Sequence, residues 1–474
     1  MSKLYILAIG GSGSRVLRSL TMLFANGIGC NSEIVPMIID PDTSNGDLIR
    51  TVDLLRLYQS IHSELEFNKN VKNKFFEACI SAFNDGDFLL SLDGTAGITF
   101  EQYLGVSTMS KENQALMKML FSEANLASDM NVGFKGNPNI GSVVLNQFTQ
   151  SANFRAFEND FVQGDKVFIV SSIFGGTGAS GFPLLLKTIR TSNNTALKNA
   201  PIGAVTLLPY FNLKDNQNSS IKADSFLTKA KAALNYYERN VTGNNTLNDM
   251  YYLGDDFTAA GYENSDGGDS QINPAHFVEM LAALAIIDFD QKQFSLPLRT
   301  RFHEFGLNDN PKPSDSITFA DLGDKTIPLI RKPMSQFAFW MSYLSKRDLS
   351  HRISQKWAKE RNRLLGSSFF SSENYSNIKR FKREYDCWIL EMANNHVGFK
   401  PFKENKDVSD PLEMIEGFKP DYGWNPLAHK GYDLMDKVLG NRISDVQQNS
   451  GSLQTFVEIF YTTTYDLCTE KLKM

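Results

Sequence analysis

The feature that most constrains this 474-residue chain is a glycine-rich stretch at residues 166–181, KVFIVSSIFGGTGASG. Its first part, Val167 to Ile173, is apolar and β-branched and predicts a buried strand. Glycines follow, and residues 182–190 then begin an apolar helix. A strand, a glycine loop and a helix in this order form an anion site, because glycines let backbone N–H groups approach a phosphate and the helix start is positive. The alternative is a glycine turn that packs a helix tightly on a sheet.

A second glycine segment follows the first predicted strand, residues 3–9. A helix and a strand at residues 33–40 come next, so the chain starts with a βαβ unit that places a phosphate loop at the end of a strand. Asp40, at the end of the second strand, could hold a ribose as in a dinucleotide site, but the GxGxxG pattern lacks its third glycine. There is also no GxxxxGK[ST] motif. The candidate residues of this segment are Gly10, Gly11, Ser12, Gly13, Ser14 and Arg15.

Composition favours a soluble globular protein over a nucleic-acid-binding or membrane-spanning one. Hydrophobic residues make up 42% and charged residues 21%, which is typical of a soluble globular chain. The net charge of −5 argues against a nucleic-acid partner. The sequence contains no secretory signal and no apolar run of the ~18–20 residues that span a membrane, so membrane association is expected only through partners. The four cysteines form no CxxC pair, which indicates a cytoplasmic location.

The rest of the pattern predicts an α/β protein with a parallel sheet. Residues 48–130 are expected to be mostly helical, residues 201–211 and 250–256 to be strands, and residues 273–289 to form a long apolar helix. Beyond residue 290 a Pro-rich linker leads into helical patterns. We therefore predict two domains, residues 1–290 and a mostly helical region at 291–474.

Several of these motifs together resemble the tubulin/FtsZ superfamily. GGTGAS at residues 175–180 is similar to the tubulin signature loop, and GxxGNPxxG at residues 133–141 is similar to the FtsZ loop that contacts the terminal phosphate. An ordinary Asn-Pro turn is the alternative for the second motif. Four such features occur in order over residues 1–290 and most resemble the bacterial tubulin-like (FtsZ-like) group. The resemblance implies a Rossmann-like GTPase domain with a central helix at 273–289.

The resemblance also implies which residues bind the ligand, expected to be GTP or GDP with Mg²⁺. The phosphate candidates are Gly133, Gly136, Asn137, Gly175, Gly176, Thr177, Gly178, Ala179 and Ser180, besides residues 10–15. Pro209 ends a strand whose following loop reaches the ribose in FtsZ. The start of the central helix faces the purine in the family, which makes Asn235, Asp255 and Glu279 candidates for reading the base. A carboxylate there could accept two hydrogen bonds from guanine.

One functional motif of the family is altered. The acidic loop after the central helix, of the form GxxNxDxxD, is replaced by AIIDFDQKQFSLPL. Asp288 and Asp290 are thus weak catalytic candidates, and we favour interpreting them as a polar helix end. Hydrolysis also requires an oriented water, so we expect a weak or partner-dependent GTPase, and whether the chain is an enzyme stays open.

The resemblance implies self-assembly into filaments, in a cytoskeletal or membrane-remodelling role, with a possible protein partner at the helical C-terminal region. Two alternatives stay open. One is a scaffold that binds a nucleotide without hydrolysing it. The other is an NAD(P)-binding Rossmann enzyme, for which we find no convincing catalytic His, Tyr-Lys or Cys set.

Overall fold

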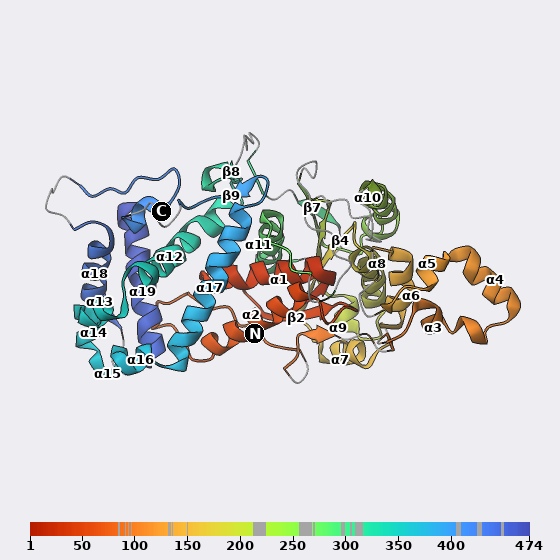
Figure 1. The fold of residues 1–474 in the computed structure, drawn as a ribbon, viewed down its shortest axis with the longest axis horizontal. Coiled ribbons are helices and arrows are strands. Elements are labelled where there is room, and N and C mark those ends of the chain that lie inside the picture. Colours follow the sequence, from red (N-terminus) through yellow and green to blue (C-terminus); the bar gives the residue numbers. More distant parts are fainter. Residues whose placement is uncertain are drawn as a thin grey trace.

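A seven-stranded parallel sheet forms the core of one half of the molecule in this computed structural model (Figure 1). The structure describes residues 1–474 except 84–85, 91, 93, 96, 131–133, 135, 149, 212–223, 256–267, 269–270, 295–298, 304–305, 309–315, 404–408, 424–428 and 447–449. The strand order is β3-β2-β1-β4-β5-β6-β7. The strands are β1 (Lys3–Ile9), β2 (Glu33–Ile39), β3 (Leu89–Leu90), β4 (Lys166–Ser172), β5 (Ile202–Leu207), β6 (Asp249–Leu253) and β7 (Arg301–His303). Its central strands are apolar and buried, as expected for a parallel sheet covered on both faces.

The chain changes direction between β1 and β4. These two strands pair in parallel from Leu4 opposite Lys166 to Ala8 opposite Val170. After β1 the chain moves to β2 on one side, and after β4 it moves to β5 on the other side. Such a switch point opens a crevice outside the carboxyl ends of the strands, where open α/β sheets bind ligands.

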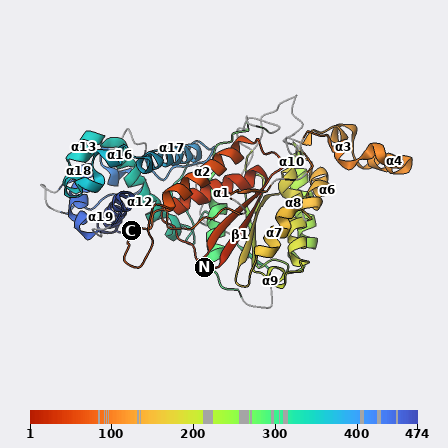
Figure 2. The ribbon, with the colours of Figure 1, turned by 90° about the horizontal axis from the view of Figure 1, so that it is seen from below.

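Helices cover both faces of the sheet. Figure 2 shows α1 (Gly10–Ala25) and α2 (Gly46–His62) on one face and α7 (Ala152–Asp160) and α8 (Gly176–Arg190) on the other. Right-handed crossovers produce this arrangement, because the two sets of connections run in opposite directions. The long helix α11 (Phe277–Gln291) packs beside α1. The remaining helices of this half are α6 (Pro138–Phe148), α9 (Thr195–Lys198) and α10 (Asp224–Tyr237), which continues into a π-helical turn, Glu238–Thr242.

The other half is mostly helical, as predicted. Its packing rests on buried aromatic rings, among them Trp340, Phe456 and Phe460, with the rings of Trp340 and Phe460 stacked 5.9 Å apart. The helices are α12 (Ile327–Lys346), α13 (Leu349–Ser354), α14 (Lys356–Glu360), α15 (Asn362–Leu365), α16 (Ser367–Phe370), α17 (Glu373–Ala393), α18 (Gly431–Arg442) and α19 (Ser452–Lys471). A short parallel pair, β8 (Ser316–Ile317) and β9 (Gly398–Phe399), and 3-10 turns at Phe319–Asp321, Pro411–Met414 and Ile443–Asp445 complete it.

The prediction of mostly helical structure over residues 48–130 is partly wrong. Helix α2 ends at His62, and the described residues of 63–99 contain β3 but no helix. Phe75 is fully buried here, with its ring 5.3 Å from that of Trp340 and 5.2 Å from that of Phe337. Packing against the distant helix α12 thus overrides the local helical pattern.

Residues 98–130 form an arm that projects from the end of the sheet half (Figures 1 and 2). It holds α3 (Phe100–Leu104), the 3-10 turn Val106–Thr108, α4 (Lys111–Leu120) and α5 (Glu123–Leu126). The rings of Phe100 and Phe121 meet inside it at 5.0 Å. Two backbone hydrogen bonds close its base, from Phe100 N–H to the Ser128 carbonyl and from Met130 N–H to the Ile98 carbonyl.

The central helix differs from its predicted bounds. It starts at Phe277, after the predicted Asn273, because the His276 ring caps it and Glu279 completes a capping box. Strand β7 lies beyond residue 290, in the predicted second domain, and the predicted boundary stays a prediction. Among the described residues, none of the helices combines the length and apolar character needed to cross a bilayer.

Candidate functional site

The first glycine segment is the start of a helix and not a separate loop. Helix α1 begins at Gly10, directly after β1, and Gly10 has a φ of +73° that favours glycine. Gly13 has a different role, because a Cβ at Gly13 would lie 2.7 Å from the carbonyl carbon of Ala8. The capping residue Ile9 makes no side-chain hydrogen bond to the helix. The first N–H groups of α1 are therefore left without a side-chain cap at the carboxyl edge of β1.

The signature segment is built in the same way. Helix α8 begins at Gly176, and its capping residue Gly175 provides no side-chain hydrogen bond. A Cβ at Gly178 would lie 2.6 Å from the carbonyl oxygen of Ser172, so this glycine packs the helix on β4. Tight packing, the alternative for the signature segment, explains Gly178, and a Cβ at Gly175 would also lie 3.0 Å from Ser172 Oγ. It explains Gly13 in the first glycine segment too, whereas Gly10 is favoured there by its positive φ.

Three segments that are distant in sequence meet at this edge. A Cβ at Gly10 would lie 3.4 Å from Cβ of Thr177, so the first turns of α1 and α8 are neighbours. A Cβ at Gly176 would lie 2.9 Å from the backbone nitrogen of Asn137, directly before α6. The starts of α1, α6 and α8 thus converge at the β1–β4 switch point, and their dipoles and N–H groups favour an anion there.

Two of the candidate hydroxyl groups make hydrogen bonds within their own helices. Ser180 Oγ donates to the carbonyl oxygen of Gly176 at 2.7 Å, within its own helix. Ser14 Oγ lies 3.5 Å from the carbonyl of Gly10 in the same way. Thr177 and Ser12 are half-buried, and the carbonyl of Ala179 accepts the Tyr237 hydroxyl. The backbone is therefore the main source of donors, which fits phosphate groups.

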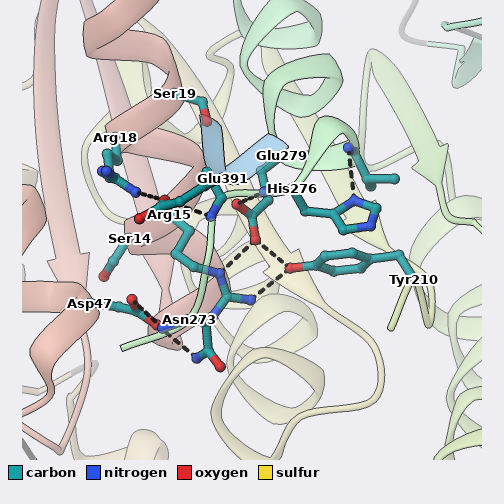
Figure 3. Close-up of polar contacts among 12 residues, drawn as sticks. Ser14, Arg15, Arg18, Ser19, Asp47, Tyr210, Asn273, His276, Glu279 and Glu391 are labelled. Atoms are coloured by element: carbon teal, nitrogen blue, oxygen red, sulfur yellow. Dashed lines mark hydrogen bonds and ion pairs between the residues drawn. The ribbon is translucent and has the colours of Figure 1, made fainter. Parts of the chain in front are cut away.

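A buried network of charges occupies the start of α11 (Figure 3). Arg15 Nε donates to Glu279 Oε1 at 2.5 Å, and its other nitrogens reach Asp47 Oδ2 at 3.2 Å and the Tyr210 hydroxyl at 2.6 Å. Glu279 Oε2 accepts the His276 N–H at 3.0 Å. Both carboxylate oxygens of Glu279 are therefore already engaged inside the protein.

Electrostatics within the network follow from its burial. Burial and the nearby Arg15 lower the pKa of His276 to about 3, so the imidazole is neutral at physiological pH. Burial raises the pKa of Asp47, although Arg15 and two hydrogen bonds from Asn273 oppose the rise. Arg15 is thus balanced by two carboxylates.

The cavity beside the Arg15–Glu279 network is too small for a nucleobase. The cavity lined by Arg15, Tyr210, Glu279 and their neighbours measures about 10 Å³, enough for about one water. A purine does not fit at this place. That Glu279 reads the base stays a prediction, and its contacts give it a role as a partner of Arg15.

The other two base candidates lie in different surroundings. Asp255, after β6, lines a cleft of about 500 Å³ together with Phe277, Leu281 and residues 306–308, 317 and 323–326. Asn235 is exposed on α10 and lines neither of these two cavities. Of the three, only Asp255 faces a space large enough for a nucleobase.

The remaining predicted residues are placed as follows. Asp40 directly follows β2 and is 4% exposed, and its Oδ1 accepts the Asp42 N–H at 3.0 Å. Burial raises the pKa of Asp40 to about 7. Pro209 is buried after β5, and Gly136 is half-buried beside Gly176. Gly133 and the chain that follows Phe211, residues 212–223, lie outside the described residues.

The catalytic candidates Asp288 and Asp290 lie at the amino ends of the strands, opposite the glycine segments. Asp290 Oδ1 accepts the Ser32 hydroxyl at 2.6 Å and lies 3.2 Å from Lys166 Nζ, and Lys166 begins β4. Asp288 Oδ2 contacts the Tyr251 hydroxyl and Lys292 Nζ, each at 2.5 Å. Both carboxylates therefore make contacts inside the chain at the amino ends of the strands, away from the glycine segments.

Sequence reasoning missed Lys229 and the partners of Arg15. Lys229 on α10 donates from Nζ to the Gly136 carbonyl at 2.7 Å. Its spacing of four residues from Ala233 and again from Tyr237 marks one face of the helix, but nothing in the sequence says what that face covers. Asp47 and Tyr210 likewise carry no local motif.

No protein-family model matches the chain, and no curated protein is similar to it in sequence. Among solved structures it is similar to CetZ from Methanosaeta thermophila (TM-score 0.29, 15% identity, 54% of this chain and 46% of that one). It is also similar to an FtsZ dimer from M. jannaschii (0.28, 16%, 54% and 45%). A third match is CetZ2 from Haloferax volcanii as a GTPγS-bound protofilament (0.30, 14%, 61% and 59%). The chain thus spans about half the length of the structures it matches, and these low scores leave the evidence for the site in its own geometry.

Proposed function

We propose that this chain binds a nucleotide through its phosphates and assembles with further copies of itself in a nucleotide-dependent way, with GTP as the ligand. The convergence of the helix starts of α1, α6 and α8 at the β1–β4 switch point is the observation that carries the proposal. CetZ2 from Haloferax volcanii is a GTPγS-bound protofilament and CetZ1 from the same organism a GDP-bound monomer, which supports guanine nucleotide as the first ligand to test.

In this proposal the backbone holds the phosphates. The N–H groups in the first turns of α1 and α8 point at the ligand, and Gly10 and Gly175 let it approach. Mg²⁺ would enter with the phosphates and neutralise their charge.

The nucleoside would extend toward the end of β6. Two strand spacings separate β4 from β6, or about 10 Å, and the cleft beside Asp255 opens there. Asp255 would read the base in this arrangement, while Arg15 and Glu279 would fix the start of α11.

Weak hydrolysis is part of the proposal. A carboxylate that orients water needs a free oxygen near the phosphate. Asp288 and Asp290 are engaged with Lys292 and Lys166, which supports their interpretation as a polar helix end. Any hydrolysis would then depend on a group from another molecule.

Assembly would bring the amino ends of the strands of one copy onto the carboxyl ends of the strands of the next. Helix α11 has 15 residues and is about 22 Å long, and it runs from the Arg15 network to Lys166 at the amino end of β4. Copies stacked along this direction would place the Asp288 end of one copy over the glycine segments of the next. Residues 1–290 would form the assembling domain in the cytoplasm, and residues 291–474 would offer a surface to protein partners.

A dinucleotide-binding enzyme is the second candidate. The strand order around β1 and the position of Asp40 after β2 also occur in dinucleotide-binding folds, where an acid at this place binds a ribose. NAD binding would favour this candidate.

Calorimetry with GTP, ATP and NAD in the presence of Mg²⁺ tests the proposal. We expect GTP to bind most tightly, and Gly176→Ala to weaken binding because its new Cβ would displace the turn at Asn137. Gly29→Ala is the matched control, since a Cβ there meets nothing within 4 Å. Sedimentation with and without GTP then tests assembly. Wild-type protein that binds none of the three ligands would refute the proposed site.

A further inference from the structure

Helix α10 lies along the start of α8 and brings a cation to it. The Tyr237 hydroxyl donates to the carbonyl of Ala179 at 3.2 Å, and its ring packs on that of Phe182 at 5.2 Å. Lys229 is eight residues before Tyr237, about 12 Å along the same face of the helix. From there its Nζ reaches the Gly136 carbonyl at 2.7 Å.

This places the Lys229 ammonium next to the converging helix starts. Gly136 precedes Asn137 and α6, and a Cβ at Gly176 would lie 3.3 Å from the Gly136 carbonyl carbon. The lysine therefore lies at the point where the first turn of α8 meets the turn before α6.

The charge of Lys229 has no counterion in the described part of the chain. Its one hydrogen bond there goes to a neutral carbonyl and uses one of three donors. The side chain is half-buried, and this burial lowers its pKa. A cation held in this way costs free energy unless an anion joins it.

We infer that Lys229 binds a phosphate group of the ligand at the Gly136–Asn137 turn and supplies the full positive charge that the backbone donors lack. The inference rests on the proposed function and adds a residue to the same site. A helix start contributes only about half a charge, whereas a lysine gives a charge-assisted hydrogen bond. The ligand class is accordingly a polyphosphate, bound more strongly the more negative charge it carries.

The test replaces the charge and keeps the hydrogen bond. Lys229→Gln retains a donor for the Gly136 carbonyl, and Lys229→Arg retains the charge. Lys231→Gln is the matched control, because Lys231 is exposed two residues further along α10. We expect Lys229→Gln to weaken GTP binding about tenfold or more by calorimetry, Lys229→Arg to restore most of the affinity, and the control to match wild type.

The outcomes separate this inference from the function on which it rests. Wild type and Lys229→Gln binding GTP equally, with both folded by circular dichroism, would overturn the role of Lys229 and leave the site standing. Equal loss in Lys231→Gln would overturn it as well, since it would indicate a general charge effect. Wild-type protein that does not bind GTP would overturn the proposed function itself.

Discussion

Replacing the buried acid Asp40 by asparagine should stabilise the protein at alkaline pH, and stabilise it much less at acidic pH. Asp40 is 4% exposed, and its described partner is the N–H of Asp42, which an asparagine oxygen can also accept. Burial raises the pKa of this carboxyl from 3.8 to about 7. The folded state therefore holds a proton that the unfolded state has already lost between these two pH values.

The sign and size of the change in unfolding free energy follow from the difference in the pKa of Asp40 between the folded and unfolded states. Stability falls as pH rises wherever the folded state binds more protons than the unfolded state. One pKa unit corresponds to about 1.4 kcal/mol, so the shift of Asp40 costs the folded state about 4 kcal/mol above pH 7. About 3 kcal/mol of this cost develops between pH 5 and pH 8. Asp40→Asn removes it.

Hydrogen exchange of the β1 and β2 amides at increasing urea measures the free energy of unfolding at pH 5 and at pH 8. Variant and wild type are compared at the same pH. Asp53→Asn, on the exposed face of α2, controls for the loss of one negative charge. The reasoning fails if the stability difference between Asp40→Asn and wild type is the same at pH 5 and pH 8.

Three further substitutions test the site. Gly176→Val should abolish GTP binding, because a Cβ at this position would lie 2.9 Å from the backbone nitrogen of Asn137; unchanged affinity in a folded variant would contradict this. Glu279→Ala should lower the free energy of unfolding by about 3 kcal/mol, because it leaves Arg15 buried with one carboxylate fewer. A relaxed preference for GTP over ATP at unchanged stability would instead make Glu279 a base reader. Asp290→Asn should destabilise the protein through its lost pairing with Lys166 and leave GTP affinity unchanged, because it lies at the far edge of the sheet; a large loss of affinity would argue against that placement.

Local patterns predicted the sheet and the glycine segments well. The strand predicted at residues 3–9 is found with the same ends, and the strand predicted at Val167 to Ile173 is found shifted by one residue. Both signals are local, since an apolar run followed by glycines specifies a strand and a tight turn without reference to other parts of the chain. Even so, the predicted glycine loops are the first turns of helices, because glycine at these positions allows close packing on a strand as well as a loop.

Contacts between distant segments could not be predicted. Nothing in the sequence indicates that the carboxylate of Glu279 pairs with Arg15, 264 residues away. Lys229 lies beside the Gly136 carbonyl only because α10 packs against α8. The described residues of 63–99 form no helix, and Phe75 among them packs against α12. In each case the decisive partner comes from another part of the fold.

The arm at residues 98–130 gives the chain a natural point of division. Its base is closed by two backbone hydrogen bonds, so it can open as a unit at small cost. Strands β1, β2 and β3 precede the arm and strands β4 to β7 follow it, and β1 pairs with β4 along five residues. A protease that cuts within α4 would therefore leave two fragments that stay joined by the sheet, and the same two fragments, expressed separately, should reassemble by complementation.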